Sequence, residues 1–221
     1  MRRFFPLPVI RPGLYFALAL LSLLSLAALA PRAAAAEPAA VIEGFHATLL
    51  AVMKDAAKLG VSGRYDLLAN VIDKDFDLQR MIRVAAGKFW RRADGAARAK
   101  VLASFRRLSI ATYAAQFDGW SGQTFITIAS RPGPQRTVLV QTKITSPGGN
   151  DAALTYVLKE RVRGNGDWRI VDVLLDGSIS QLAVRRSEYQ RVLKSSGLKG
   201  LIKVLDAKAG ELLAAQRQQG R

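Results

Sequence analysis

The spacing of hydrophobic residues changes at Asp118-Gly119, and this change limits the folds open to the chain. Before it, apolar residues recur every three to four positions, which is typical of one helix face. After it, apolar and polar residues alternate, as in strands that bury one side. The helical spacing returns near Ser178. The pattern predicts an α+β fold in which N-terminal helices precede an antiparallel sheet and C-terminal helices pack back on that sheet.

Four helices are expected before the sheet. The spacing places them over 42–56, 65–72, 78–89 and 94–117. Gly60 and Gly63 close the first helix, whose apolar stripe is Ile42, Phe45, Leu49, Val52, Met53 and Ala56. Asp77 and Asp94 precede the last two helices, where a carboxylate accepts hydrogen bonds from free backbone N–H groups.

Four strands joined by short turns are expected next. They lie over 125–128, 137–145, 154–159 and 168–173. Turns rich in Gly and Pro separate them, which predicts a four-stranded antiparallel meander. Ser178 and Gln181 then fit a capping box, in which the hydroxyl and the amide satisfy end N–H groups. A helix is expected from there to about Lys194, and another one after Gly197.

Residues 1–36 have the order of a secretory signal peptide. A cationic start leads into an apolar run over 14–30, and Ala34-Ala35-Ala36 offers a small-residue cleavage site. The alternative is an uncleaved membrane anchor, but the run is short of the roughly 20 residues that a spanning helix needs. We therefore expect cleavage, export to the periplasm and a single mature domain over 37–221.

The composition narrows the possible partners. The chain has no cysteine, which excludes a lipoprotein anchor, disulfides and thiolate metal sites. Its formal net charge is +16, and because the signal peptide holds four Arg and no acidic residue, the mature chain carries +12. This charge favours an anionic membrane surface as a partner. Nucleic acid is not expected, since no long basic stretch is interleaved with aromatics. Simple solubility is the alternative reason for the charge.

No catalytic residue, cofactor or metal site is predicted. His46 is the only histidine, and we expect it half-buried at the rim of the first helix stripe, without partners for general-base catalysis. Asp73, Asp75 and Asp77 alternate as in a calcium loop, but the glycine and the closing glutamate of such a loop are missing. Trp90 is expected in the core.

Three blocks of sequence carry a resemblance to a known family. They are Phe76-Asp77-Leu78 to Trp90-Arg91, Phe105 through Tyr113 to Phe125, and Trp168 through Asp172 to Tyr189. Over about 40–210 the chain resembles the MlaC family of periplasmic lipid-binding proteins, also called the toluene-tolerance auxiliary family. Asp176-Gly177-Ser178-Ile179-Ser180, followed by Arg186-Ser187-Glu188-Tyr189, is most similar to the hopanoid-associated HpnM branch.

The resemblance implies a lipid carrier rather than an enzyme. It implies an apolar cavity between sheet and helices, without catalytic residues. It also implies that the protein shuttles phospholipid between an outer-membrane lipoprotein complex and an inner-membrane ATP-driven transporter. In the HpnM branch the ligand is expected to be a hopanoid, a polycyclic triterpenoid.

Candidate site residues follow from the expected cavity. Its apolar wall is expected to include Phe105, Tyr113, Phe125, Val140, Tyr156, Leu158, Trp168 and Ile170. Arg185 and Arg186 are candidates for contact with a headgroup or a partner, with a solvated helix face as the alternative. Two other functions stay open: a cup-shaped enzyme with Asp172 as its acid–base residue, and a basic interaction module without a pocket.

Overall fold

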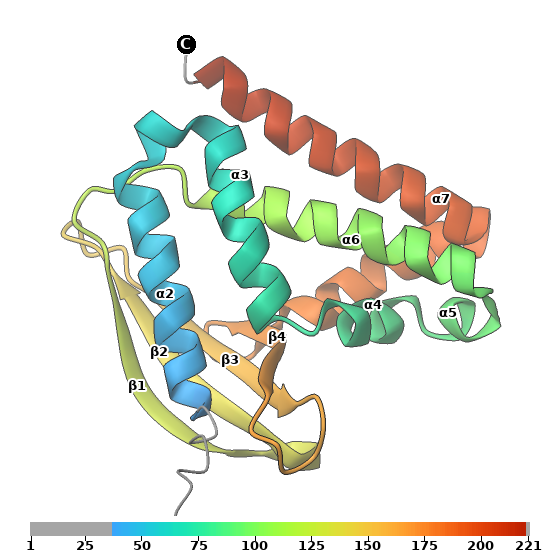
Figure 1. Cartoon of the computed structure of the whole chain (residues 1–221), viewed down its shortest axis with the longest axis horizontal. Coiled ribbons are helices and arrows are strands. Elements are labelled where there is room, and N and C mark those ends of the chain that lie inside the picture. The colour runs from blue at the N-terminus through green and yellow to red at the C-terminus, as the bar shows by residue number, and fades with distance from the viewer. Residues whose placement is uncertain (1–36, 220–221) are drawn as a thin grey trace, which may run out of the picture. The chain divides into compact units, whose positions relative to one another are not determined.

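The sheet is an antiparallel meander in which strands adjacent in sequence are also adjacent in space (Figure 1). The computed structural model describes residues 37–219, so the expected signal peptide lies outside the described residues. The strands are β1 (Thr124–Gly133), β2 (Thr137–Thr145), β3 (Ala152–Glu160), β4 (Trp168–Leu175) and β5 (Ile179–Ser180). The α+β class predicted from the sequence is confirmed.

The sheet has five strands rather than the predicted four. Asp176 and Gly177 adopt φ angles of 49° and 71°, so the chain turns back at once and β5 pairs with the end of β4. Asp-Gly favours such a hairpin because tight hairpin turns need residues with positive φ. The following helix therefore begins later, and the Ser180 hydroxyl accepts a hydrogen bond from the Ala183 N–H at 2.9 Å. The capping box expected to begin at Ser178 is wrong by two residues.

Helices pack on the inner face of the sheet and on one another. They are α2 (Pro38–Lys54), α3 (Ala56–Asp75), α4 (Leu78–Ala86), α5 (Lys88–Arg92), α6 (Gly95–Gln116) and α7 (Gln181–Gln219). In Figure 1, α2 lies across the sheet near β1 and β2, and α6 runs beside α7. As predicted, Asp77 and Asp94 cap α4 and α6 by accepting hydrogen bonds from backbone N–H groups, at 2.9 and 2.7 Å.

Glycines break the helices at three positions. Gly87 has a φ of 56° and separates α4 from α5, so the helix expected over 78–89 is two helices. Gly60 and Gly197 combine a φ near 60° with ψ of −178° and −162°, a region open essentially only to glycine. Each changes the direction of the chain inside a longer helical segment, which helical periodicity alone does not reveal.

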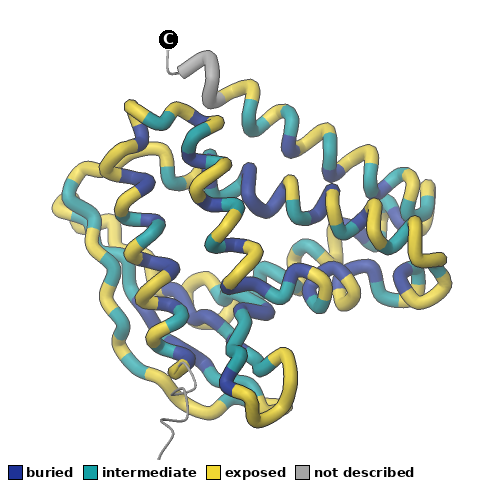
Figure 2. Tube along the Cα trace, viewed as in Figure 1, coloured by how far each residue is buried: buried dark blue, intermediate teal, exposed yellow. Residues whose placement is uncertain are grey.

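The core lies where the sheet meets the helices. Figure 2 shows buried positions recurring along each helix with exposed positions between them. The apolar stripe of α2 and the inner residues of β3 are buried, as is Trp90, which confirms the prediction for that residue. Among the helices of residues 37–219, none combines the length and the apolar character needed to cross a membrane.

Candidate functional site

An apolar cavity of about 190 Å³ lies between the inner face of the sheet and the helices. The sheet contributes Leu154, Tyr156 and Val173 to its wall. The helices contribute five apolar or aromatic residues: Ile72, Leu78, Met81, Tyr113 and Leu182. They also contribute five polar ones: Ser109, Thr112, Gln116, Gln181 and Arg185. Taken with the sheet residues the wall is mostly apolar and accepts hydrocarbon, and its polar side chains can orient a polar group of the ligand. Among the described residues that line the cavity, Arg185 alone carries a charge.

The structure brings two of the eight predicted wall residues to this cavity. Tyr113 and Tyr156 line it. Four others are fully buried but fill the core around it instead: Phe105, Val140, Leu158 and Ile170. Phe125 is half-buried against Phe117, and Trp168 lines a separate shallow hollow beside Arg169. Their role in ligand binding stays a prediction.

Several lining residues were missed by the sequence reasoning. α3 supplies Ile72, the residue after α3 is Phe76, α4 supplies Met81, and α6 supplies Thr112 and Gln116. Periodicity shows which side of a helix is buried, but it does not show whether a side chain or open space lies opposite. The alternation in β3 and β4 likewise shows the buried face of each strand but not what lies opposite it. The cavity is therefore visible only in the packed structure.

His46 lies in the interior, which corrects the expectation of a half-buried rim residue. Its side chain is 4% exposed, and its Nε2 lies 3.0 Å from the Tyr156 hydroxyl. The imidazole ring also stacks on Phe125, with 4.5 Å between the ring centroids. Burial lowers the pKa of His46 to about 4, so the ring is neutral at neutral pH. The neutral ring anchors α2 to β3 and β1.

Asp172, the candidate acid–base residue of the enzyme alternative, is not among the residues that line the cavity and instead binds the start of α7. Its carboxylate accepts hydrogen bonds from the Ser180 hydroxyl and from the Leu182 N–H at 2.9 Å. These bonds fix β5 and the first turn of α7. Among the described residues that line the cavity there is no carboxylate and no histidine. Within residues 37–219, no three acidic or histidine side chains gather to hold a metal ion.

Most of the described chain matches a protein-family model. The model of the MlaC protein family matches residues 43–207, from α2 to within α7. The chain belongs to the MlaC family. Among curated proteins, none matches this MlaC-family chain.

A solved structure with the same fold is the phospholipid-binding protein from Ralstonia solanacearum, which was determined in complex with a phospholipid. It aligns with this MlaC-family chain at a TM-score of 0.69 and 22% sequence identity. The alignment covers 80% of this chain and 99% of the Ralstonia chain. At this level of identity the similarity shows a shared fold.

In this MlaC-family protein the two adjacent arginines of α7 lie in different environments. Arg185 is half-buried at the cavity, with its guanidinium 5.5 Å from the centre of the Phe105 ring and Nη1 3.4 Å from the Ser109 hydroxyl. Within the described part of the chain, no carboxylate forms an ion pair with Arg185. Arg186 is exposed and lines a shallow hollow on the surface of α7. Successive helical residues point about 100° apart, since a helix has 3.6 residues per turn.

Proposed function

We propose that this protein is a periplasmic lipid carrier whose apolar cavity holds the hydrocarbon part of the lipid. The observation that supports the proposal most directly is the apolar space left open between sheet and helices, with Arg185 as the one charged residue among the described residues that line it. Membership in the MlaC family supports it, as does the phospholipid bound to the Ralstonia protein of the same fold.

Transfer energetics favour a carrier without catalytic residues. Two acyl chains of about 16 carbons gain roughly 25 kcal/mol on leaving water, at about 0.8 kcal/mol per CH₂. The difference between a membrane and an apolar cavity is small, because the chains are dry in both. A closed cavity and docking partners are therefore sufficient for transfer, and we propose a carrier rather than an enzyme.

The cavity must widen to hold such a lipid. Its volume of about 190 Å³ is below the roughly 300–1,000 Å³ of ordinary ligand pockets. Among the wall elements, α4 is short, at nine residues, and it lies between the turn at Asp77 and the break at Gly87. We propose that α4 moves away from the sheet when the lipid enters.

Arg185 favours a lipid with an anionic headgroup. A cation beside an apolar cavity, with no acidic partner among the described residues, gains a charge-assisted hydrogen bond when a phosphate reaches it. A phospholipid supplies that phosphate, whereas a polycyclic triterpenoid is mostly hydrocarbon. We propose phospholipid as the ligand, and the similarity of 176–189 to the HpnM branch makes a hopanoid the second candidate.

Direction and partners follow from the carrier role. We propose that an outer-membrane lipoprotein complex and an inner-membrane ATP-driven transporter exchange lipid with the protein. Because the lipid's free energy is similar in a membrane and in the cavity, the partners would set the direction. Transfer between reconstituted partners without ATP should then show little net flux, and strongly one-way flux would contradict this.

A cavity-blocking substitution tests the proposed function. Val173→Trp places an indole in the cavity, whereas Val184→Trp adds the same group at a site on α7 that is 40% exposed. Native mass spectrometry of protein purified from the periplasm should find phospholipid on the wild type and on Val184→Trp. We expect Val173→Trp to carry at least tenfold less. Equal lipid content in the two variants, or a wild type without lipid in repeated preparations, would refute the proposal.

A further inference from the structure

A second hollow, of about 470 Å³, opens at the surface next to the apolar cavity. Four arginines surround it, and we call it the arginine hollow: Arg80 and Arg83 of α4, Arg106 of α6 and Arg161 at the end of β3. Phe76 and Leu78 line both the hollow and the cavity, so the link between α3 and α4 and the first residue of α4 form the wall between them.

The acidic residues in the arginine hollow do not balance its positive charge. Asp77 lies 3.1 Å from Arg80 Nε, and Asp73 accepts two hydrogen bonds from Arg106 at 2.6 and 2.7 Å. Arg83 is exposed and has no ion-pair partner within the described residues. Both acidic residues that line the hollow are therefore paired with arginines of the hollow. Arg83 has no acidic partner among the described residues.

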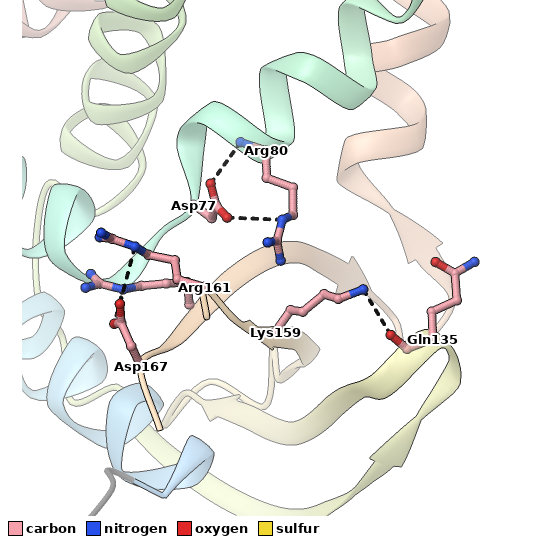
Figure 3. A network of polar contacts seen from close by, with 7 residues as sticks. Asp77, Arg80, Gln135, Lys159, Arg161 and Asp167 are labelled. Carbon is pink, nitrogen blue, oxygen red and sulfur yellow. Dashed lines mark hydrogen bonds and ion pairs between the residues drawn. The ribbon is translucent and has the colours of Figure 1, made fainter. Parts of the chain in front are cut away.

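Arg161 and Arg80 add to this excess of positive charge. Figure 3 shows Arg161 beside Asp167, at 3.3 Å, but that carboxylate is closer to Arg169, at 2.6 Å. In the same view Arg80 reaches from α4 toward the sheet, and its buried Nη1 has no hydrogen-bond partner within the described residues. A buried cationic donor without a partner is unfavourable, so an anion near this group would stabilise it.

We propose that the arginine hollow docks the protein on an anionic bilayer by taking up the phosphate of one lipid headgroup. Guanidinium groups match phosphate oxygens with two parallel hydrogen bonds, and several of them can hold one phosphate. The hollow is concave, which suits a group that protrudes from a surface. At its rim Val162 is 63% exposed and can enter the headgroup layer.

This docking site is separate from the lipid cavity and goes beyond the proposed carrier function. The mature chain is strongly basic, so an anionic surface attracts the whole protein, and the arginine hollow gives that attraction a defined contact. The shared wall of Phe76 and Leu78 would bring a docked bilayer next to the cavity.

Vesicle binding tests the proposal with two variants of equal charge. Arg83→Gln/Arg161→Gln removes two exposed arginines of the hollow, and Lys199→Gln/Lys203→Gln removes two exposed charges from α7. Protein purified from the periplasm is sedimented with vesicles of phosphatidylglycerol and phosphatidylcholine, or of phosphatidylcholine alone. Melting curves and native mass spectra of each variant check the fold and the bound lipid.

We expect the hollow variant to bind anionic vesicles at least fivefold more weakly than the wild type, while the α7 variant stays within twofold. Neither should bind phosphatidylcholine alone, and both should keep their bound lipid. An equal loss in the two variants would mean that only net charge matters, and would overturn the proposal. Unchanged binding by the hollow variant would also overturn it, and would favour an acidic protein segment as the occupant. Loss of bound lipid with vesicle docking intact would count against the carrier function alone.

Discussion

His46 couples the interior of the protein to pH. Burial lowers its pKa from 6.5 to about 4, so the folded protein holds the neutral ring against Tyr156 and Phe125. A histidine in an unfolded chain binds a proton at a higher pH than the buried one does. The stability contributed by the neutral ring is therefore complete above pH 6.5 and is lost as the pH falls toward 4.

This shift predicts a measurable loss of stability in acid. His46 alone should reduce the free energy of unfolding by about 3 kcal/mol between pH 7 and pH 4, at about 1.4 kcal/mol per pKa unit. His46→Gln keeps a hydrogen-bonding group near Tyr156 but does not titrate. Urea denaturation at the two pH values should therefore show a smaller decrease for the variant, by about this amount. Parallel decreases in both proteins would show that the imidazole is already solvated in the native state.

Arg185 is the residue expected to select the headgroup. Arg185→Gln removes the only charge among the described cavity-lining residues, whereas Arg191→Gln removes an exposed charge from the same helix. We expect the fraction of anionic phospholipid in the bound lipid to fall several-fold for Arg185→Gln and to stay unchanged for Arg191→Gln. Lipid extraction and mass spectrometry measure this fraction. The same headgroup composition in both variants would show that Arg185 does not select the headgroup.

At the scale of elements, α7 depends on a glycine at its bend. Gly197 and Gly210 both leave an added Cβ without any atom within 4 Å, so only backbone conformation distinguishes them. Gly197→Ala should cost about 1–3 kcal/mol, because its backbone lies in a region nearly closed to other residues. Gly210→Ala should stabilise the helix by up to about 1 kcal/mol. The melting temperatures of the two variants should therefore shift in opposite directions. Equal shifts would contradict the need for glycine at the bend.

The elements themselves were predicted best where local rules act alone. α6 begins after Asp94, as its capping carboxylate indicates, and β2 has the predicted bounds of 137–145. The break at Gly87 and the strand β5 were missed. Both depend on positive φ angles at a few residues, and the helical or alternating spacing around them gives no sign of such a turn.

Across the whole molecule, the first helix of the described residues begins directly after the expected end of the signal peptide. α2 starts at Pro38, with Glu37 as its N-cap residue, so cleavage after Ala36 would leave every described element complete. We predict that protein recovered from the periplasm begins at Glu37, as N-terminal sequencing can establish. A full-length chain recovered in the membrane fraction would instead support the uncleaved anchor.

Sequence patterns alone specify the α+β class, the order of the elements and the caps at Asp77 and Asp94. These features depend on backbone periodicity and on hydrogen bonds between residues a few positions apart. The burial of His46 depends on tertiary packing, because the residue contacts Tyr156, which lies 110 positions further along the chain. Tertiary packing also sets that Tyr113 lines the cavity whereas Phe105 fills the core. Packing between distant elements sets whether a buried residue contacts another side chain or lines a cavity. The pattern of apolar residues in the sequence does not distinguish these two outcomes.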